Sequence, residues 1–150
     1  MTLEMEMKTQ VLYDKVLFGL REQGHRSMSR NADSDSEQCA YRGDNNDKCA
    51  IGLLIPDAAY DPLIEGVSMY SITHEEDLKD VTSPKQRQKI QTLRNVLRES
   101  GIRDSQLPLL HCLQNAHDDF LKLSMTAFEN KMIYLADVFS LQYTPPKDKE

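Results

Sequence analysis

The run Lys48-Cys49-Ala50-Ile51-Gly52-Leu53-Leu54-Ile55 carries no charged side chain after Lys48. A short run of this kind is typical of a strand that is covered on both faces. It follows the cluster Gly43-Asp44-Asn45-Asn46-Asp47, which is typical of a turn, and a second strand-like run at residues 39–42. The segment 39–55 therefore predicts a β-hairpin. We expect Ile51 and Ile55 to be buried against the first helix or the helix of His117, and a side chain at Gly52 to clash with a close neighbour.

Apolar residues at helical spacing predict several helices that could cover this hairpin. The expected ranges are 3–23, ended by Gly24; 84–100, begun by Ser83-Pro84; a helix from residue 104 or 105 that includes His117; and 125–139. Residues 56–66 predict short helical turns, 25–38 a loop, and 67–82 an irregular segment. The predicted fold class is α+β and mostly helical, with a short β-hairpin packed against four to five helices. We expect one globular domain over residues 1–143 and a frayed tail at 144–150.

The charge, the hydrophobic pattern and the number of cysteines disfavour several classes of function and location. The chain has 24 acidic and 18 basic residues, a net charge of −6, which disfavours broad binding to nucleic-acid phosphates. The sequence lacks an apolar run long enough for a membrane span, and its acidic N-terminus is unlike a signal peptide. Three cysteines is an odd number, which makes a disulfide framework improbable. We therefore expect a cytoplasmic protein that is not in a membrane.

Cys39, Cys49 and His117 are the candidate metal ligands, because thiolates and imidazole bind zinc. The fourth ligand would be Cys112, His111 or Asp118. Structural zinc sites, however, usually use closely spaced cysteine pairs, and a free cysteine commonly packs as a small apolar side chain. Core packing is the favoured interpretation, so we predict no cofactor and keep zinc as the alternative.

Cys49 and His117 are also the weak candidates for catalysis, with Asp118 to orient the histidine. Adjacent residues on an α-helix point roughly 100° apart, so Asp118 is expected to be a poor partner for His117. The favoured interpretation of His117 is a histidine at the edge of the core that bonds backbone groups or Tyr41. We therefore predict no catalytic residues and favour a protein that is not an enzyme.

The stretch CAYRGDNNDKCAIGLLIPDAAYDPLIEG, residues 39–66, resembles a family of small proteins encoded by bacteriophages, prophages and bacteria. Their shared pattern is C-x-Y-R, a Gly-rich turn, K-C-A-x-G-x-L-I-P-D-x-x-Y, and then E-G. Many also carry L-Q-x-x-H-D on a later helix, which matches residues 113–118 here. Many relatives have a further cysteine where this chain has Leu53, which weakens any site that needs a third thiolate in the hairpin. The resemblance implies a phage-like origin, and hence host cytoplasm, more than a chemistry.

The first functional hypothesis is a phage-type accessory protein that binds and modulates a host protein, such as a defence or nucleic-acid-processing component. The alternatives are a structural metal-binding domain, or a small enzyme or ligand-binding protein in which Tyr41 and Arg42 orient an anion beside Cys49 and His117. The residues expected to bind a ligand or partner are Tyr41, Arg42, Asp57, Tyr60 and Glu65.

Overall fold

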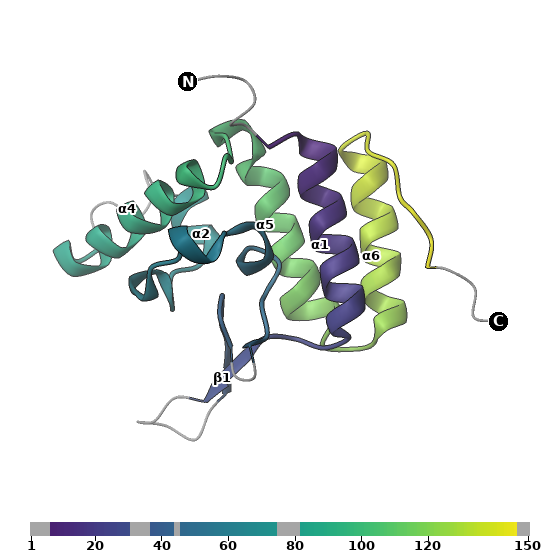
Figure 1. Ribbon diagram of the computed structural model, residues 1–150, viewed down its shortest axis with the longest axis horizontal. Coiled ribbons are helices and arrows are strands. Elements are labelled where there is room, and N and C mark those ends of the chain that lie inside the picture. The colour runs from purple at the N-terminus through teal and green to yellow at the C-terminus, as the bar shows by residue number, and fades with distance from the viewer. Residues whose placement is uncertain (1–6, 31–36, 44–45, 75–81, 147–150) are drawn as a thin grey trace.

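The structure, a computed structural model, describes residues 7–30, 37–43, 46–74 and 82–146. Its α-helices are α1 (Thr9–Gln23), α2 (Met69–Thr73), α4 (Pro84–Glu99), α5 (Leu107–Asn115) and α6 (Met125–Val138). In Figure 1, α1 lies between α5 and α6, and α4 lies on the far side of α5. The short helix α2 and the turns before it lie between α4 and the group of helices formed by α1, α5 and α6.

The first helix ends at the predicted residue. Gly24 adopts a left-handed conformation with φ of 78°, and its N–H donates to the carbonyl of Leu20. The five apolar residues that were expected to share a face, Leu12, Tyr13, Val16, Leu17 and Leu20, are all fully buried. The helix begins at Thr9, and the predicted start at residue 3 lies outside the described residues.

The later helices also follow their predicted signals. The Ser83 side chain accepts a hydrogen bond from the N–H of Gln86 at the start of α4, and Gly101 follows its end with φ of 87°. Residues Asp104–Gln106 form a 3₁₀ turn before α5, and Ala116–Phe120 continue α5 as a π-helical turn. Ser124 caps α6 by accepting from the N–H of Ala127.

The fold class is all-α, so the α+β prediction and its hairpin over residues 39–55 are wrong. Residues Gly52–Leu54 form a 3₁₀ helix, in which the N–H of Leu54 donates to Ile51 and that of Ile55 donates to Gly52. One isolated antiparallel bridge, between Arg42 and Lys48, stands where the strand pairing was expected. An apolar run of this length can be covered as a coil of turns as well as a strand, and here it packs on α1.

Two further elements differ from prediction. The expected loop 25–38 contains a short antiparallel ribbon, β1 (Met28–Arg30) with β2 (Glu37–Cys39), in which Met28 pairs with Cys39. The residues between these strands lie outside the described part. The segment 67–82 was expected to be irregular, but it contains α2, whose start is capped by Ser68. The ribbon is too small to change the all-α class.

The burial expected for the run 48–55 is confirmed although its strand is not. Ile51 and Ile55 have 0% and 2% of their surface exposed. A Cβ atom on Gly52 would lie 2.1 Å from the carbonyl oxygen of Tyr41, so a side chain there would clash with the backbone. The apolar content of the run therefore predicted its burial but not its conformation.

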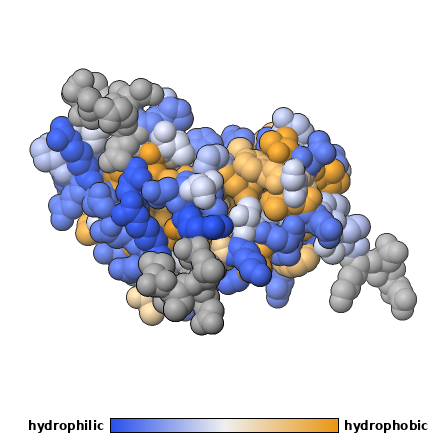
Figure 2. Space-filling model, turned by 90° about the horizontal axis from the view of Figure 1, so that it is seen from above, coloured by the Kyte–Doolittle hydropathy of each residue, from blue (hydrophilic) through white to orange (hydrophobic). Residues whose placement is uncertain are grey.

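Hydrophilic and apolar side chains are distributed unevenly between the two ends of the molecule. Viewed from above, hydrophilic side chains cover most of the end that contains α4, and apolar side chains gather over the other end (Figure 2). The large exposed apolar side chains of α1 and α6 are Val11, Phe18, Ile133, Tyr134 and Val138. Within the described ranges, no helix is long and apolar enough to cross a lipid bilayer. The carbonyl of Thr144 accepts from Arg21, and residues 147–150 of the predicted tail lie outside the described residues.

Candidate functional site: a cleft beside the 39–66 motif

Glu65 is the centre of a hydrogen-bond network that holds the motif segment together. Its carboxylate accepts the backbone N–H groups of Tyr41 and Arg42, each at 3.0 Å. The hydroxyl of Tyr60 donates to the same carboxylate at 2.5 Å. The side chain of Glu65 thus supplies the acceptors that a strand partner would have supplied to the N–H groups of residues 41 and 42.

Arg42 is engaged within the same network. Its Nη1 donates to Oδ1 of Asp57 at 2.6 Å, and its Nη2 donates to the carbonyl of Ile55 at 2.6 Å. Its guanidinium lies over the ring of Tyr60, 5.0 Å from the centroid. The hydrogen bond from Arg42 lowers the pKa of Asp57. The five predicted binding residues are therefore brought together, but they contact one another, and both terminal nitrogens of Arg42 already have hydrogen-bond partners within the protein.

His117 is fully buried and both of its ring nitrogens are bonded. The N–H of Ser27 donates to Nε2 at 2.8 Å, so Nε2 carries a lone pair and the ring is neutral. Nδ1 then carries the proton and donates to Oδ1 of Asp118 at 2.7 Å. The expectation that Asp118 would be a poor partner is wrong, because residues 116–120 form a π-helical turn and the short carboxylate reaches the ring nitrogen nearest the backbone.

Cys49 has 1% of its surface exposed, and burial raises the pKa of its thiol well above the usual range. The N–H of Gly52 donates weakly to its sulfur at 3.3 Å. A buried, protonated thiol is a poor nucleophile and a poor metal ligand. Among the described residues, no three His, Cys, Asp or Glu side chains gather closely enough to hold a metal ion. The side chain of Cys39 lies outside the described part, so its role in a metal site stays a prediction.

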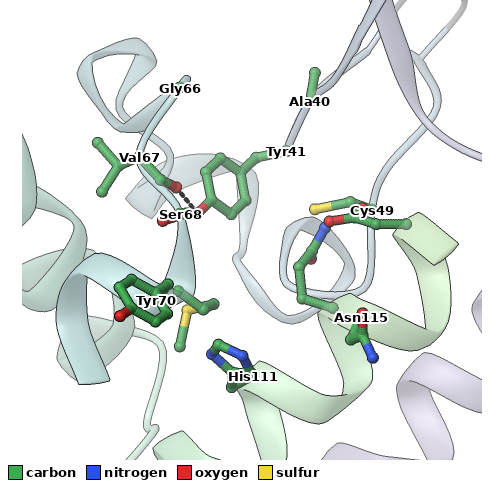
Figure 3. Close-up of a pocket in the computed structure, with 12 residues that line it drawn as sticks. Ala40, Tyr41, Cys49, Gly66, Val67, Ser68, Tyr70, His111 and Asn115 are labelled. Carbon is green, nitrogen blue, oxygen red and sulfur yellow. Dashed lines mark hydrogen bonds between the residues drawn. The ribbon is translucent and has the colours of Figure 1, made fainter. Parts of the chain in front are cut away.

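A cleft of about 330 Å³ opens beside the Glu65 network. Tyr41 and Cys49 of the first motif line it together with Gln114 and Asp118 of the later helix. The two motif segments therefore meet, and the N–H of Ile51 also donates to Oε1 of Gln114 at 3.2 Å. Figure 3 shows the ring of Tyr41 facing the space between Tyr70 and Cys49, with His111 and Asn115 on the α5 side. The complete lining is Ala40, Tyr41, Cys49, Gly66, Val67, Ser68, Met69, Tyr70, His111, Gln114, Asn115 and Asp118.

From the sequence, His111 and Asp118 were considered as possible fourth zinc ligands, and Asp118 also as a partner that orients His117. Gln114, Asn115 and α2 were missed as parts of a binding site. A signal for the α5 side of the cleft exists in the sequence: His111, Gln114, Asn115 and Asp118 recur at helical spacing, opposite the apolar face of the same helix. A signal for α2 also exists, because Ser68 precedes apolar residues 69 and 72 in the manner of an N-cap. Of the five predicted binding residues, Tyr41 lines the cleft, and Arg42, Asp57, Tyr60 and Glu65 do not.

Comparison of the chain with protein-family models, with curated proteins and with solved structures found no match.

Proposed function

We propose that this chain is a phage-type accessory protein that acts in the host cytoplasm by binding and modulating a host protein. The proposal is supported by a contrast between the reactive side chains of the motif and the cleft beside them. These side chains are engaged inside the fold, whereas the cleft opens to solvent. This arrangement favours a recognition surface over chemistry performed by Cys49, His117 or Arg42.

The reactive groups are engaged in three different ways. Burial raises the pKa of the Cys49 thiol, which keeps it protonated. Both ring nitrogens of His117 are bonded within the fold. The guanidinium of Arg42 is shared between Asp57 and the carbonyl of Ile55. Catalysis by the predicted candidates, Cys49 and His117, would need at least one of them to be within reach of a substrate. Binding is therefore better supported than the enzyme alternative.

The proposal is tested by blocking the cleft without touching the network behind it. Asn115 lines the cleft on α5, and Asn130 is an exposed residue on α6, so Asn115→Trp and Asn130→Trp introduce the same bulk at two places. Each immobilised chain is exposed to a lysate of the cells in which the gene is expressed. We expect the parent and N130W to retain the same specific protein and N115W to lose it.

Repeated failure of the parent chain to retain any specific protein would contradict the proposal. Equal retention by the parent, N115W and N130W would show that a partner binds elsewhere on the surface. Circular dichroism melts of both variants serve as the control for folding, because a tryptophan that unfolded the chain would mimic a blocked cleft.

A further inference from the structure

The cleft has a chemistry that selects one class of ligand. We propose that it binds a cationic side-chain group, a guanidinium or an ammonium, that the partner protein presents. This inference rests on the proposed function and adds the chemical class that the cleft recognises. Three features support it: the charge of the lining, the way Asp118 is held, and the aromatic rings on the opposite wall.

The lining carries one carboxylate. Its twelve residues include Asp118 and one histidine, His111, and contain no lysine or arginine. The carboxylate of Glu65 is bonded to the backbone of Tyr41, which also lines the cleft. Burial is the main cause that raises the pKa of Tyr41 and of Cys49, and the nearby carboxylates of Asp118 and Glu65 raise both pKa values further. A negative, partly desolvated cleft attracts a cation and opposes an anion.

Asp118 is held in place by two hydrogen bonds. Its Oδ1 accepts from Nε2 of Gln114 at 2.8 Å and from Nδ1 of His117 at 2.7 Å. Among the described residues no hydrogen bond ends on Oδ2, so that oxygen can face a ligand. Nε2 of His117 accepts from the amide of Ser27, so the histidine donates through Nδ1 and orients the carboxylate. The Asp118 side chain is 34% exposed, so a ligand can reach it from the cleft. A positioned carboxylate of this kind forms charge-assisted hydrogen bonds with little reorganisation.

Aromatic rings complete the site. Tyr41 is fixed by its hydroxyl, which donates to the carbonyl of Val67. Tyr70 stacks on His74 with 3.9 Å between centroids and is half exposed at the cleft. The faces of tyrosine rings attract ammonium and guanidinium groups. The volume of about 330 Å³ is near the lower end of the range for ligand pockets, roughly 300–1,000 Å³, which suits one side chain better than a large molecule.

The test compares arginine and citrulline derivatives, which differ in charge and hardly in shape, and adds a lysine derivative as a second cation. N-acetyl-arginine amide, N-acetyl-lysine amide and N-acetyl-citrulline amide are titrated into the ¹⁵N-labelled full chain, and amide shifts are recorded by NMR. We expect the two cations to shift the amides of Tyr70, Asn115 and Asp118, and citrulline to bind at least about tenfold more weakly, a ratio typical of losing a charged pair. Equal binding of citrulline, or shifts confined to residues outside the cleft, would overturn the proposal.

Substitutions inside and outside the cleft test whether the cation binds there. Asn115→Lys places a competing ammonium inside the cleft and should abolish binding of the arginine probe, whereas Asn130→Lys makes the same change on α6 and should leave it unaltered. Asp118→Asn should weaken binding at least about tenfold while citrulline binding stays the same. If N115K and N130K bind the arginine probe equally, the cleft is not the site. Because Asp118 also bonds His117, the NMR spectrum of D118N verifies its fold, and N115K tests the cleft independently.

Two sources of the cation are distinguished by further probes. The peptide Gly-Gly-Arg-Gly-Gly represents a partner protein, and agmatine and putrescine represent free cations. Tighter binding of the peptide supports a cation presented by a partner, and tighter binding of agmatine or putrescine overturns that part in favour of a small ligand. If the chain binds the arginine probe more tightly than citrulline but captures no host protein, the cation site stands and the proposed function is contradicted. If the chain captures a host protein that N115W does not capture, but binds arginine and citrulline equally, the proposed function stands and the cation site is contradicted.

Discussion

The helices α1, α5 and α6 and the motif segment 39–66 are stabilised by different kinds of interaction. The three helices bury apolar faces, with fully buried side chains such as Leu17, Leu113 and Phe128. The motif segment consists of short 3₁₀ turns that also bury apolar side chains, but the backbone at Tyr41 and Arg42 is held by the side-chain carboxylate of Glu65. The comparison teaches that hydrophobic periodicity specifies the helices, whereas the motif segment depends on particular polar groups in addition to its apolar side chains.

The two regions meet at Ile51, which belongs to the motif segment but lies in the common core. Ile51→Ala should lower the free energy of unfolding by about 2–5 kcal/mol, the range for emptying a filled core site. The matched control is Ile133→Ala, because Ile133 is 46% exposed on α6, and that change should stay within about 0.5 kcal/mol. Urea unfolding of both variants measures the difference. Similar midpoints for the two variants would show that the motif segment is not anchored in the core.

Glu65 tests the polar half of the comparison. Glu65→Ala leaves the partly buried amides of Tyr41 and Arg42 without their acceptor and should destabilise the protein by roughly 1–3 kcal/mol. Glu22 is exposed on α1, so Glu22→Ala is the control and should have little effect. Thermal melts of the two variants give the comparison. If E65A and E22A have the same melting temperature, the hydrogen bonds of Glu65 do not hold the motif segment.

The ion pair between α1 and α6 should make stability depend on acid. Burial raises the pKa of Glu129, but the hydrogen bonds from Arg21 and Tyr143 outweigh it, so the pKa lies below its usual value. A lowered folded-state pKa stabilises the fold above the usual glutamate pKa, and this contribution is lost as pH falls through the folded-state value. Glu129→Gln should therefore cost about 1 kcal/mol or less at neutral pH and nearly nothing in acid. Melting temperatures of parent and E129Q from pH 7 to pH 3 measure this, and a constant difference would contradict it.

The same contrast explains how far the sequence could predict the structure. Signals local to the chain predicted the long helices: Gly24 ends α1 and Ser83 begins α4 as expected. The run 48–55 was interpreted as a strand because apolar content reports burial, and both a strand and a set of 3₁₀ turns satisfy it. The acceptor that replaces a strand partner, Glu65, is 24 residues from Tyr41, and no local signal indicates that pairing.

For the candidate site, the sequence indicated residues but not their roles. Tyr41, Arg42 and Glu65 were expected to face a ligand, whereas most of the polar atoms of this group face one another. Asp118 was considered a poor partner for His117 under α-helical geometry, and the π-helical turn changes that geometry. The cleft itself depends on the packing of α2 against α5, which is a tertiary contact that periodicity does not specify.

Hydrogen–deuterium exchange of E65A and the parent chain tests the contrast between the two regions most directly. If Glu65 fastens the motif segment to a helical scaffold, the amides of Tyr41, Arg42 and Leu54 should exchange faster in E65A, because their segment opens locally. The amides of Val16 and Met132, in the centres of α1 and α6, should keep their protection. Equal acceleration of all these amides, or unchanged exchange at Tyr41 and Arg42, would contradict the separate stabilisation of the two regions.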